Sequence, residues 1–257
     1  MLLAIDVGNT NIVFAVFADD GTIRAGWRIA TIAEITADEL TDWMNRALAD
    51  KQIEKEKISD AIISSVVPLM RGELIDFCKN YISNEPLVVG EGGVSLGIEV
   101  LVDNPAEVGA DRLVNAVGAA EKYAVPLIVI DFGTATTFDV VDENGNYAGG
   151  VIAPGINLSL DALHHATAKL PKVTVSKPER VIGKATVPAM QSGIYWGYVS
   201  IIEGIVKRIK DELGLEMGVI ATGGLAHLFS EGTDIIKTVD GDLTVNGLFA
   251  IWRKNKN

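Results

Sequence analysis

The sequence predicts an α/β protein of two domains, each built on a mixed β-sheet. Two apolar stretches, residues 2–5 and 127–130, each lead into an aspartate and a turn that contains glycine and hydroxyl-bearing residues. A second β-rich stretch follows each of them and reaches a turn pair, Asp20-Gly21 or Asn144-Gly145. Tight turns of this kind join antiparallel strands, whereas strand–helix alternation favours parallel pairing, so both sheets should be mixed.

The first half is expected to contain strands and helices in a regular order. Residues 37–48 should form a helix because Leu40, Met44 and Leu48 recur at helical spacing. Pro68 fits the first turn of a second helix, where its missing N–H is not needed. In chain order the expected elements are strands over 2–6, 11–18 and 22–30, a helix over 37–48, a strand over 61–67, a helix from Pro68 to about Tyr81, and a strand over 87–89.

The second half repeats the strand, hairpin and strand order from Leu127 to Gly155. Residues 105–123 are expected to form one helix that crosses between the halves, so we place the domains at 1–118 and 119–257. The remaining expected elements are a helix over 188–213, a strand over 218–221, a turn over 222–224, a helix from Leu225, and a last helix over about 243–253.

Composition narrows the class of protein. The 257 residues are 48% hydrophobic and 22% charged, which is typical of a well-packed enzyme. The formal net charge of −12 argues against a nucleic-acid partner, because such proteins use Lys and Arg to neutralise phosphates. No apolar run approaches the ~20 residues of a membrane span, and no signal peptide is evident. With Cys78 as its only cysteine, the chain is expected to be cytoplasmic, without a membrane partner.

Asp6 and Asp131 are the first candidates for a functional site. Each follows a buried apolar strand, and open α/β sheets bind ligands at the carboxyl ends of their strands. A carboxylate there can hold Mg²⁺ directly or through water, together with phosphate oxygens. The alternative is that each aspartate only caps its turn through its side chain. Two such residues in a repeated context favour the functional interpretation.

The turns that follow these aspartates suit phosphate. Gly8-Asn9-Thr10-Asn11 and Gly133-Thr134-Ala135-Thr136-Thr137 combine glycine, which allows close backbone approach, with amide or hydroxyl donors. Ordinary hairpin turns that happen to contain Gly and Asn are the alternative. Neither turn has the Lys-Ser/Thr ending of a Walker loop, and neither opens a helix as a Rossmann turn does. The sequence therefore predicts a different phosphate-binding design.

These segments together resemble a known superfamily. Asp6-Val7-Gly8-Asn9-Thr10-Asn11 resembles the first phosphate motif of the acetate and sugar kinase, actin and heat-shock chaperone ATPase superfamily, and Asp131-Phe132-Gly133-Thr134 resembles the second. Ala221-Thr222-Gly223-Gly224 is similar to its adenosine motif. The resemblance implies two ribonuclease-H-like (actin-like) domains with mixed sheets and a nucleotide cleft between them.

Within the superfamily the sequence is identified as a member of the type III pantothenate kinases. The supporting segments are Gly109-Ala110-Asp111-Arg112, residues 149–155 and Met190-Gln191-Ser192-Gly193, at a fitting overall length. The resemblance implies a kinase that transfers the γ-phosphoryl group of ATP to the primary hydroxyl of pantothenate, the first step toward coenzyme A. It also implies Mg²⁺ with the ATP, a monovalent cation (K⁺ or NH₄⁺) near Asp131, and a homodimer.

The resemblance also assigns roles to residues. Substrate contacts are implied at Gly109, Ala110, Asp111, Arg112 and Thr186, the last reached across the dimer interface. ATP contacts are implied at Asp6, Val7, Gly8, Asn9, Thr10, Asn11, Ile12, Val13, Thr134, Gly223 and Gly224.

The family's general base corresponds to Asp111. A hydroxyl nucleophile needs a nearby carboxylate to accept its proton, so the residue type suits the role. The alternative for Asp111 is a first-turn aspartate that interacts with its helix N-terminus. Arg112 fits a clamp on the pantothenate carboxylate, or else a surface ion pair. Thr186 could instead be a helix N-cap.

One departure from the family concerns the acceptor. Many members carry a Tyr shortly before the Gly-Ala-Asp-Arg segment, where this chain has Val102-Asp103-Asn104-Pro105. The missing hydroxyl affects acceptor affinity more than phosphoryl transfer. Two other functions stay open: a catalytically weak nucleotide-binding accessory or regulatory protein on the same fold, and a kinase or phosphatase of the superfamily with another acceptor.

Overall fold

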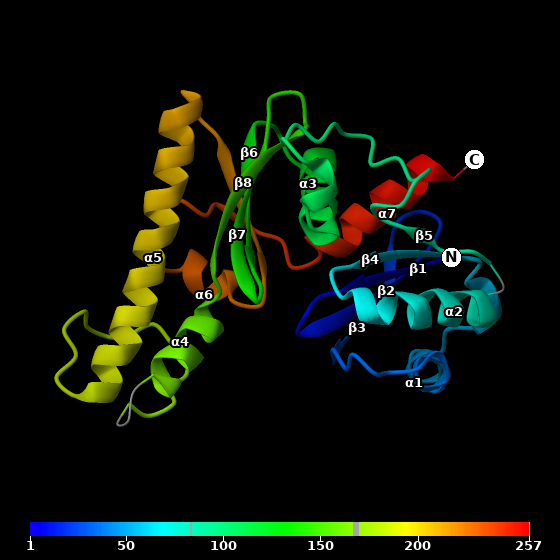
Figure 1. The fold of residues 1–257 in the computed structure, drawn as a ribbon, viewed down its shortest axis with the longest axis horizontal. Coiled ribbons are helices and arrows are strands. Elements are labelled where there is room, and N and C mark those ends of the chain that lie inside the picture. Colours follow the sequence, from blue (N-terminus) through cyan, green and yellow to red (C-terminus); the bar gives the residue numbers. More distant parts are fainter. Residues whose placement is uncertain (83, 167–169, 257) are drawn as a thin grey trace. The chain divides into compact units, whose positions relative to one another are not determined.

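The computed structural model describes the whole chain except residues 83, 167–169 and 257, and it contains two five-stranded sheets (Figure 1). The strand orders are β3-β2-β1-β4-β5 and β10-β9-β6-β7-β8. In each sheet the first strand of the half pairs antiparallel with the next strand along the chain and parallel with a later one. Both sheets are therefore mixed, as the hairpin signals predict.

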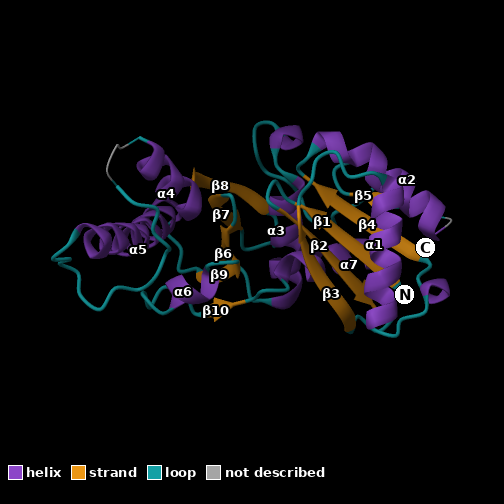
Figure 2. Cartoon of the chain, turned by 90° about the horizontal axis from the view of Figure 1, so that it is seen from below, coloured by secondary structure: helices purple, strands orange, loops and turns teal. Residues whose placement is uncertain are grey.

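The first sheet forms a three-layer unit with its helices (Figures 1 and 2). Leu3, Ile5 and Val7 face a core that includes α1 and α2, and Leu2 and Ala4 face a second core that includes α3 and α7. The elements are β1 (Leu2–Val7), β2 (Asn11–Phe17), β3 (Ile23–Ala30), α1 (Ala37–Asp50), β4 (Asp60–Ser65), α2 (Arg71–Ile82), β5 (Leu87–Val88), α3 (Ala110–Lys122) and α7 (Leu243–Asn255), with 3₁₀ turns at Lys55–Lys57, Pro68–Met70 and Pro105–Glu107.

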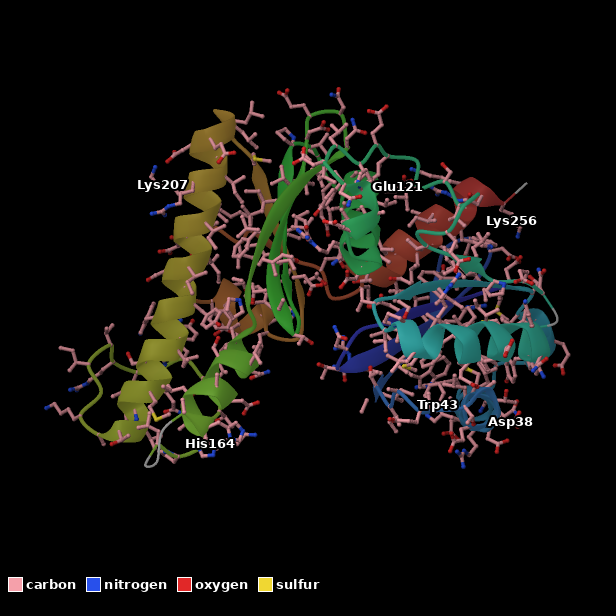
Figure 3. All side chains as sticks on the ribbon, in the orientation of Figure 1. Asp38, Trp43, Glu121, His164, Lys207 and Lys256 are labelled. Atoms are coloured by element: carbon pink, nitrogen blue, oxygen red, sulfur yellow. The ribbon has the colours of Figure 1, made fainter. Side chains whose placement is uncertain are left out.

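Helix α1 illustrates how local sequence sets these elements. Thr36 caps its N-terminus through a capping box with Glu39, which satisfies backbone N–H groups that the helix itself leaves unpaired. The buried Leu40, Met44 and Leu48 then face the sheet. Trp43 projects from the same helix and packs against Phe14 of β2, with ring centroids 4.8 Å apart (Figure 3).

The second sheet repeats this topology with its helices on one face. Ile128, Ile130 and Phe132 of β6 contribute to a core that also contains residues of α4, α5 and α6. The elements are β6 (Leu127–Phe132), β7 (Ala135–Val141), β8 (Tyr147–Pro154), α4 (Ile156–His165), α5 (Thr186–Leu213), β9 (Gly218–Gly223), α6 (Ala226–Ser230) and β10 (Thr238–Val239).

Two predictions about elements need correction, and two further elements are absent from the predicted set. The single helix expected over 105–123 is wrong: a 3₁₀ turn, Pro105–Glu107, is separated from α3 by Val108 and Gly109. Pro68 opens a 3₁₀ turn, and the α-helix itself begins at Arg71. Helix α4 and the two-residue strand β10 were not predicted, because both are short and β10 is defined by its pairing with β9.

Helix α7 packs with the first half of the chain although it lies at the end of the sequence. Contacts group residues 1–99, 103–121 and 243–257 into one compact unit, and 100–102 and 122–242 into the other. Val245, Leu248 and Ile251 of α7 share a core with Leu2 and Ile62. The expected division into folding domains at 1–118 and 119–257 stays a prediction. It differs from the packing mainly at residues 243–257, which pack with the first unit.

Candidate active site

In the first unit, Asp6 lies at the carboxyl end of β1, before a tightly held hairpin turn. The N–H of Gly8 donates to the carbonyl of Asn11 over 2.9 Å, and the Thr31 hydroxyl donates to the carbonyl of Gly8 over 2.7 Å. Asn9 and Thr10 are exposed at the tip of the turn. The turn thus holds short polar side chains at the end of β1, beside the Asp6 carboxylate, where the phosphate site is predicted.

The predicted ATP segment divides between the turn and the core. Val7 and Ile12 are buried in the core under α1 and α2, at 1% and 0% exposure. Their side chains cannot meet a ligand, so any contact from these positions must come from the backbone. Asp6, Gly8 and Asn11 are partly exposed.

Asp111 lies at the same end of the first sheet as Asp6. The N–H of Val66, just after β4, donates to the carbonyl of Val7 over 3.0 Å. Gly109 lies beside Val66, since a Cβ at Gly109 would be 3.7 Å from Val66 Cγ1. The N-terminus of α3, which carries Asp111, thus reaches the carboxyl ends of β1 and β4. Asp6 also alternates with Leu2 and Ala4, on the sheet face that α3 and α7 cover.

The surroundings of Asp111 suit a base. Burial raises the pKa of the Asp111 carboxyl above its usual value, although the hydrogen bond from the Arg112 N–H and the Arg112 charge oppose this shift. Asp111 Oδ1 accepts that N–H over 2.8 Å. Contact with the helix N-terminus therefore occurs, and it accompanies rather than replaces the features of a base. A carboxylate with a raised pKa is a better proton acceptor at neutral pH.

Gly109 makes room for this carboxylate. A Cβ at Gly109 would lie 2.6 Å from Asp111 Oδ1, closer than van der Waals contact allows. Ala110 and Arg112 flank Asp111 in the first turn of α3, and both are partly exposed. The Gly-Ala-Asp-Arg segment therefore owes its glycine to the position of the carboxylate.

In the second unit, Asp131 occupies the position in β6 that Asp6 occupies in β1. The N–H of Gly133 donates to the carbonyl of Ala135 over 3.0 Å, and Gly133 and Thr134 are exposed. Next to Asp131, Phe132 stacks on Phe229 of α6 with centroids 5.4 Å apart, which anchors the strand end. The sequence repeat therefore corresponds to a repeated geometry.

Two glycines shape the surroundings of Asp131 and Thr134. Gly223 has a φ of +89°, and a Cβ there would lie 2.6 Å from Asp131 Oδ1 and 2.7 Å from the Phe132 nitrogen. A Cβ at Gly155 would lie 2.0 Å from the Thr134 carbonyl oxygen. Both positions therefore require glycine. Gly224, the next residue of the predicted adenosine motif, is exposed.

Thr186 and Val102 also lie in the second unit. Thr186 is the first residue of α5 and is exposed, and the N-cap position belongs to Ala185 without a side-chain cap. The N-cap alternative for Thr186 is therefore wrong. Val102 lies beside Gly149 of β8, where a Cβ would be 3.7 Å from Val102 Cγ1. The position where the family resemblance leads us to expect Tyr thus packs against a strand of the second sheet.

The second sheet contains a hydrogen-bonded group of three polar residues, Thr137, Asp139 and Tyr147, that the sequence analysis did not predict. Asp139 of β7 has 0% exposure, and it accepts hydrogen bonds from Thr137 Oγ1 and from Tyr147 OH, each 2.9 Å long. Its sequence signal was available: Thr137 and Asp139 alternate on a strand whose other positions are mostly apolar.

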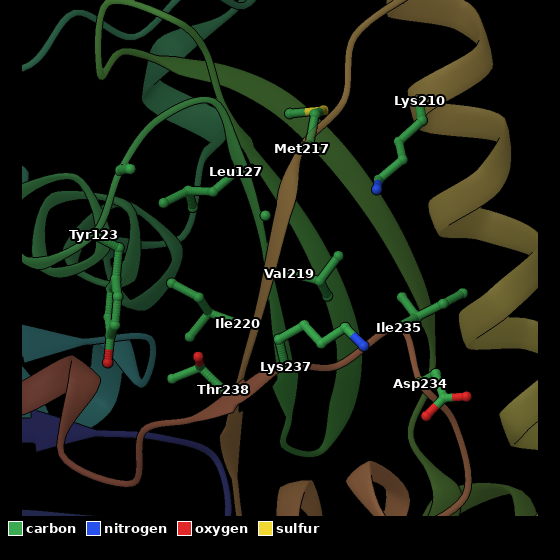
Figure 4. A pocket seen from close by; sticks show the side chains of 12 residues that line it. Tyr123, Leu127, Lys210, Met217, Val219, Ile220, Asp234, Ile235, Lys237 and Thr238 are labelled. Carbon is green, nitrogen blue, oxygen red and sulfur yellow. The ribbon is translucent and has the colours of Figure 1, made fainter.

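The second unit also contains a pocket of about 440 Å³ away from the predicted site residues (Figure 4). It begins at the amino ends of β6 and β9, next to Leu127 and Gly218, whereas Asp131 lies at the carboxyl end of β6. Lys210, Asp234 and Lys237 contribute charged side chains to its lining. None of the predicted site residues lines it.

No helix among the described residues is long and apolar enough to cross a membrane. In the same part of the chain, no three or more His, Cys, Asp or Glu side chains are grouped to hold a metal ion.

The topology of the two sheets is that of the actin-like ATPase fold class. Similar solved structures include a putative Baf family transcriptional activator from Campylobacter jejuni, with a TM-score of 0.64, 18% identity and 98% coverage of both chains. A putative 2-dehydro-3-deoxygalactonokinase from Sinorhizobium meliloti has a TM-score of 0.59 and 15% identity, over 99% of this chain and 96% of that one. At such identities the likeness concerns the fold alone.

Sequence comparison identifies the family. The family model for type III pantothenate kinase matches residues 2–208. A type III pantothenate kinase from Paramagnetospirillum magneticum is 62% identical over 99% of this chain and 98% of its own length. A second, from Rhodospirillum rubrum, is 59% identical over 100% of this chain and 99% of its own. The chain belongs to the type III pantothenate kinase family.

Proposed function

We propose that the chain transfers the γ-phosphoryl group of ATP to the primary hydroxyl of pantothenate, the first step of coenzyme A biosynthesis, with Asp111 as the general base. Sequence identities of 62% and 59% to type III pantothenate kinases, over 99% and 100% of the chain, support the reaction. The observation that carries the assignment of the base is the half-buried Asp111 carboxylate, whose pKa burial raises, at the end of the sheet where Asp6 lies.

We assign the ATP phosphates to the two strand-end turns. The tips at Asn9-Thr10 and Gly133-Thr134 are exposed and carry hydroxyl-bearing side chains, and the space around Gly224 is open for the adenosine part, since nothing lies within 4 Å of a Cβ there. Asp6, partly exposed at the end of β1, is the residue that would hold Mg²⁺, directly or through water. When bound, Mg²⁺ neutralises charge on the phosphate oxygens.

Asp131 would hold the monovalent cation, K⁺ or NH₄⁺. Gly223 packs closely against this carboxylate, since a Cβ there would lie 2.6 Å from Asp131 Oδ1. Asp131 itself is partly exposed, and a carboxylate oxygen is a hard ligand that suits such a cation.

Asp111 acts on the acceptor. Its Oδ1 already accepts the Arg112 N–H, so we assign Oδ2 to the proton of the pantothenate hydroxyl. Arg112 is the candidate clamp for the pantothenate carboxylate, because its planar guanidinium matches that group. Gly109 and Ala110 complete this part of the site. Most of the rate enhancement in such a site comes from positioning and charge stabilisation.

We further propose a homodimer in which Thr186 contacts the pantothenate of the partner subunit. Exposed large hydrophobic side chains on the second unit support this, because a protein contact would remove them from water. They are Ile152, Leu158, Val181, Ile182, Val187 and Ile201. The cytoplasm is the proposed location, consistent with a free, buried Cys78.

A coupled assay tests the reaction. Purified protein with ATP, Mg²⁺ and K⁺ should release ADP only when pantothenate is added. ADP release without an acceptor would contradict the kinase assignment, and a complete lack of turnover would favour the accessory-protein alternative. A screen of other small hydroxy acids as acceptors tests whether Val102 has changed the preference.

Replacing Asp111 with Asn tests the base. Loss of a general base lowers kcat by about 10²- to 10⁴-fold. ATP affinity, measured by calorimetry, should stay close to that of the unchanged protein, because Asp111 faces the acceptor. Unchanged turnover in Asp111→Asn would remove the assignment of the base while leaving the overall reaction intact.

A further inference from the structure

Asp139 is a buried carboxylate that the proposed mechanism does not use. It has 0% exposure on β7, where an apolar residue would avoid the cost of burying a charge. Its Oδ2 accepts a hydrogen bond from Thr137 Oγ1 and its Oδ1 accepts one from Tyr147 OH, each 2.9 Å long. The carboxylate thus fixes the direction of two hydroxyl protons.

Thr137 connects Asp139 to the strand-end site. In the antiparallel β6–β7 pair Thr137 lies directly opposite Asp131, so both side chains project from the same face with their Cβ atoms about 4.5–5.5 Å apart. Thr137 and Asp131 are partly exposed, whereas Asp139 is fully buried behind them. The order from the site inward is therefore Asp131 and Thr137, then Asp139, then Tyr147.

The direction of the Thr137 proton decides what its oxygen can bind. A hydroxyl has one proton and two lone pairs. The proton of Thr137 is directed to Asp139, so Oγ1 presents only lone pairs to its other neighbours. Next to the negative Asp131 carboxylate, lone pairs favour a positively charged partner and disfavour an anion such as phosphate.

We propose that Thr137 Oγ1 and the Asp131 carboxylate bind the same monovalent cation, and that Asp139 is a positioning residue that turns the Thr137 proton away from it. This deepens the cation assignment made above and rests on it. Asp139 does not touch the cation itself; it acts by keeping the Thr137 oxygen an acceptor.

Thermal unfolding of the full-length protein in KCl tests the proposal without turnover. Choline chloride keeps the ionic strength constant, and no substrate is added. A ligand that binds only the folded state raises Tm with its concentration. The unchanged protein should show a saturable K⁺-dependent rise. A flat response would overturn the cation site at Asp131 as well as the role of Thr137.

Two substitutions separate the new role from the cation site. Thr137→Val removes the oxygen and keeps the shape, so the half-saturating K⁺ concentration should rise at least tenfold. Asp139→Asn should raise it too, because an amide N–H can donate to Thr137 and turn its proton toward the cation. Thr137→Ser retains the hydroxyl and should restore the response. An unchanged midpoint in Thr137→Val, with a normal response in the unchanged protein, would overturn the role of Thr137 alone.

Tyr147→Phe is the matched control for lost stability. It deletes the other hydrogen bond to Asp139 and leaves Thr137 in place. Its Tm should fall in the absence of K⁺, but its K⁺ midpoint should match that of the unchanged protein. If Tyr147→Phe loses the K⁺ response as well, Asp139 has a general structural role and the positioning role is wrong.

Discussion

Gly109 leaves the space that the Asp111 carboxylate occupies. The backbone of Gly109 does not require a glycine, because it is not among the glycines with a positive φ. Its requirement is steric: a Cβ would meet the Asp111 carboxylate at 2.6 Å. The site therefore depends on a missing methyl group as much as on the carboxylate itself.

Gly109→Ala should impair catalysis more than stability. The end of a side chain can move away from the new methyl group, so the free energy of unfolding should change by less than about 1 kcal/mol. The displaced carboxylate should lower kcat by about 10²-fold, as an error of roughly 1 Å in a catalytic group does. Steady-state kinetics and thermal unfolding of the same preparation measure both quantities.

The pH profile provides a second readout for Gly109→Ala. The base must be deprotonated, so kcat/KM falls as the pH drops through the pKa of Asp111, which burial raises. If the methyl group pushes the carboxylate toward water, this pKa falls and the acid limb moves to lower pH. A variant with unchanged kcat and an unchanged acid limb would contradict this account of Gly109.

At the scale of elements, glycines at the contact between α3 and α7 allow the two helices to approach closely. A Cβ at Gly247 would lie 2.1 Å from the Val114 carbonyl oxygen, and one at Gly118 would lie 2.7 Å from the Leu243 carbonyl oxygen. Both obstacles are backbone atoms, which cannot move as a side chain does. This close approach brings Val245, Leu248 and Ile251 into the core of the first unit.

Gly247→Ala should therefore destabilise the protein. Overpacking costs about 1–3 kcal/mol, and each kcal/mol lowers Tm by about 2–4 °C in a chain of this size. Gly72→Ala in α2 is the matched control, because no atom lies within 4 Å of a Cβ there. That change should be neutral or stabilising. Equal Tm values for the two variants would contradict the helix contact.

The predicted elements that the structure confirms have strong local signals. The hairpins of β1–β2 and β6–β7 were recognised because each strand is apolar and each turn carries glycine. The helix expected over 105–123 was wrong because its apolar periodicity continues across Gly109, whereas the backbone of Val108 is extended, with φ −75° and ψ 126°, and α3 begins only at Ala110. Strand β10 has only two residues and depends on pairing with β9, which no local pattern reveals.

For the whole molecule, the two units share one topology but differ in how the chain completes them. Residues 122–242 form the second unit almost without interruption, whereas the first unit requires α7 from the end of the chain. The expected domain 1–118 lacks that helix and with it part of a core that includes Leu2, Ala4 and Ile62.

Fragments of the chain test this dependence. Residues 1–121 alone should show no cooperative thermal transition, because α7 no longer covers one face of the sheet. Residues 1–121 joined to 243–257 by a short flexible linker should unfold cooperatively. The linker can be short because Gly118 lies against Leu243. Circular dichroism measures both thermal transitions. A cooperative transition in the shorter fragment would support the domain boundary at 118 instead.

The sequence alone determined the repeated strand-turn units, the mixed sheets and the family, because local patterns and ordered motifs carry those features. The residues of the site stay its prediction. Tertiary structure alone decided that α7 completes the first unit and that Gly109 makes room for Asp111. It also directed the proton of Thr137 toward Asp139. The packing of α7 joins residues that are distant in sequence, and the other two features depend on the exact positions of side-chain atoms two residues apart. Hydrophobic periodicity records neither kind of contact.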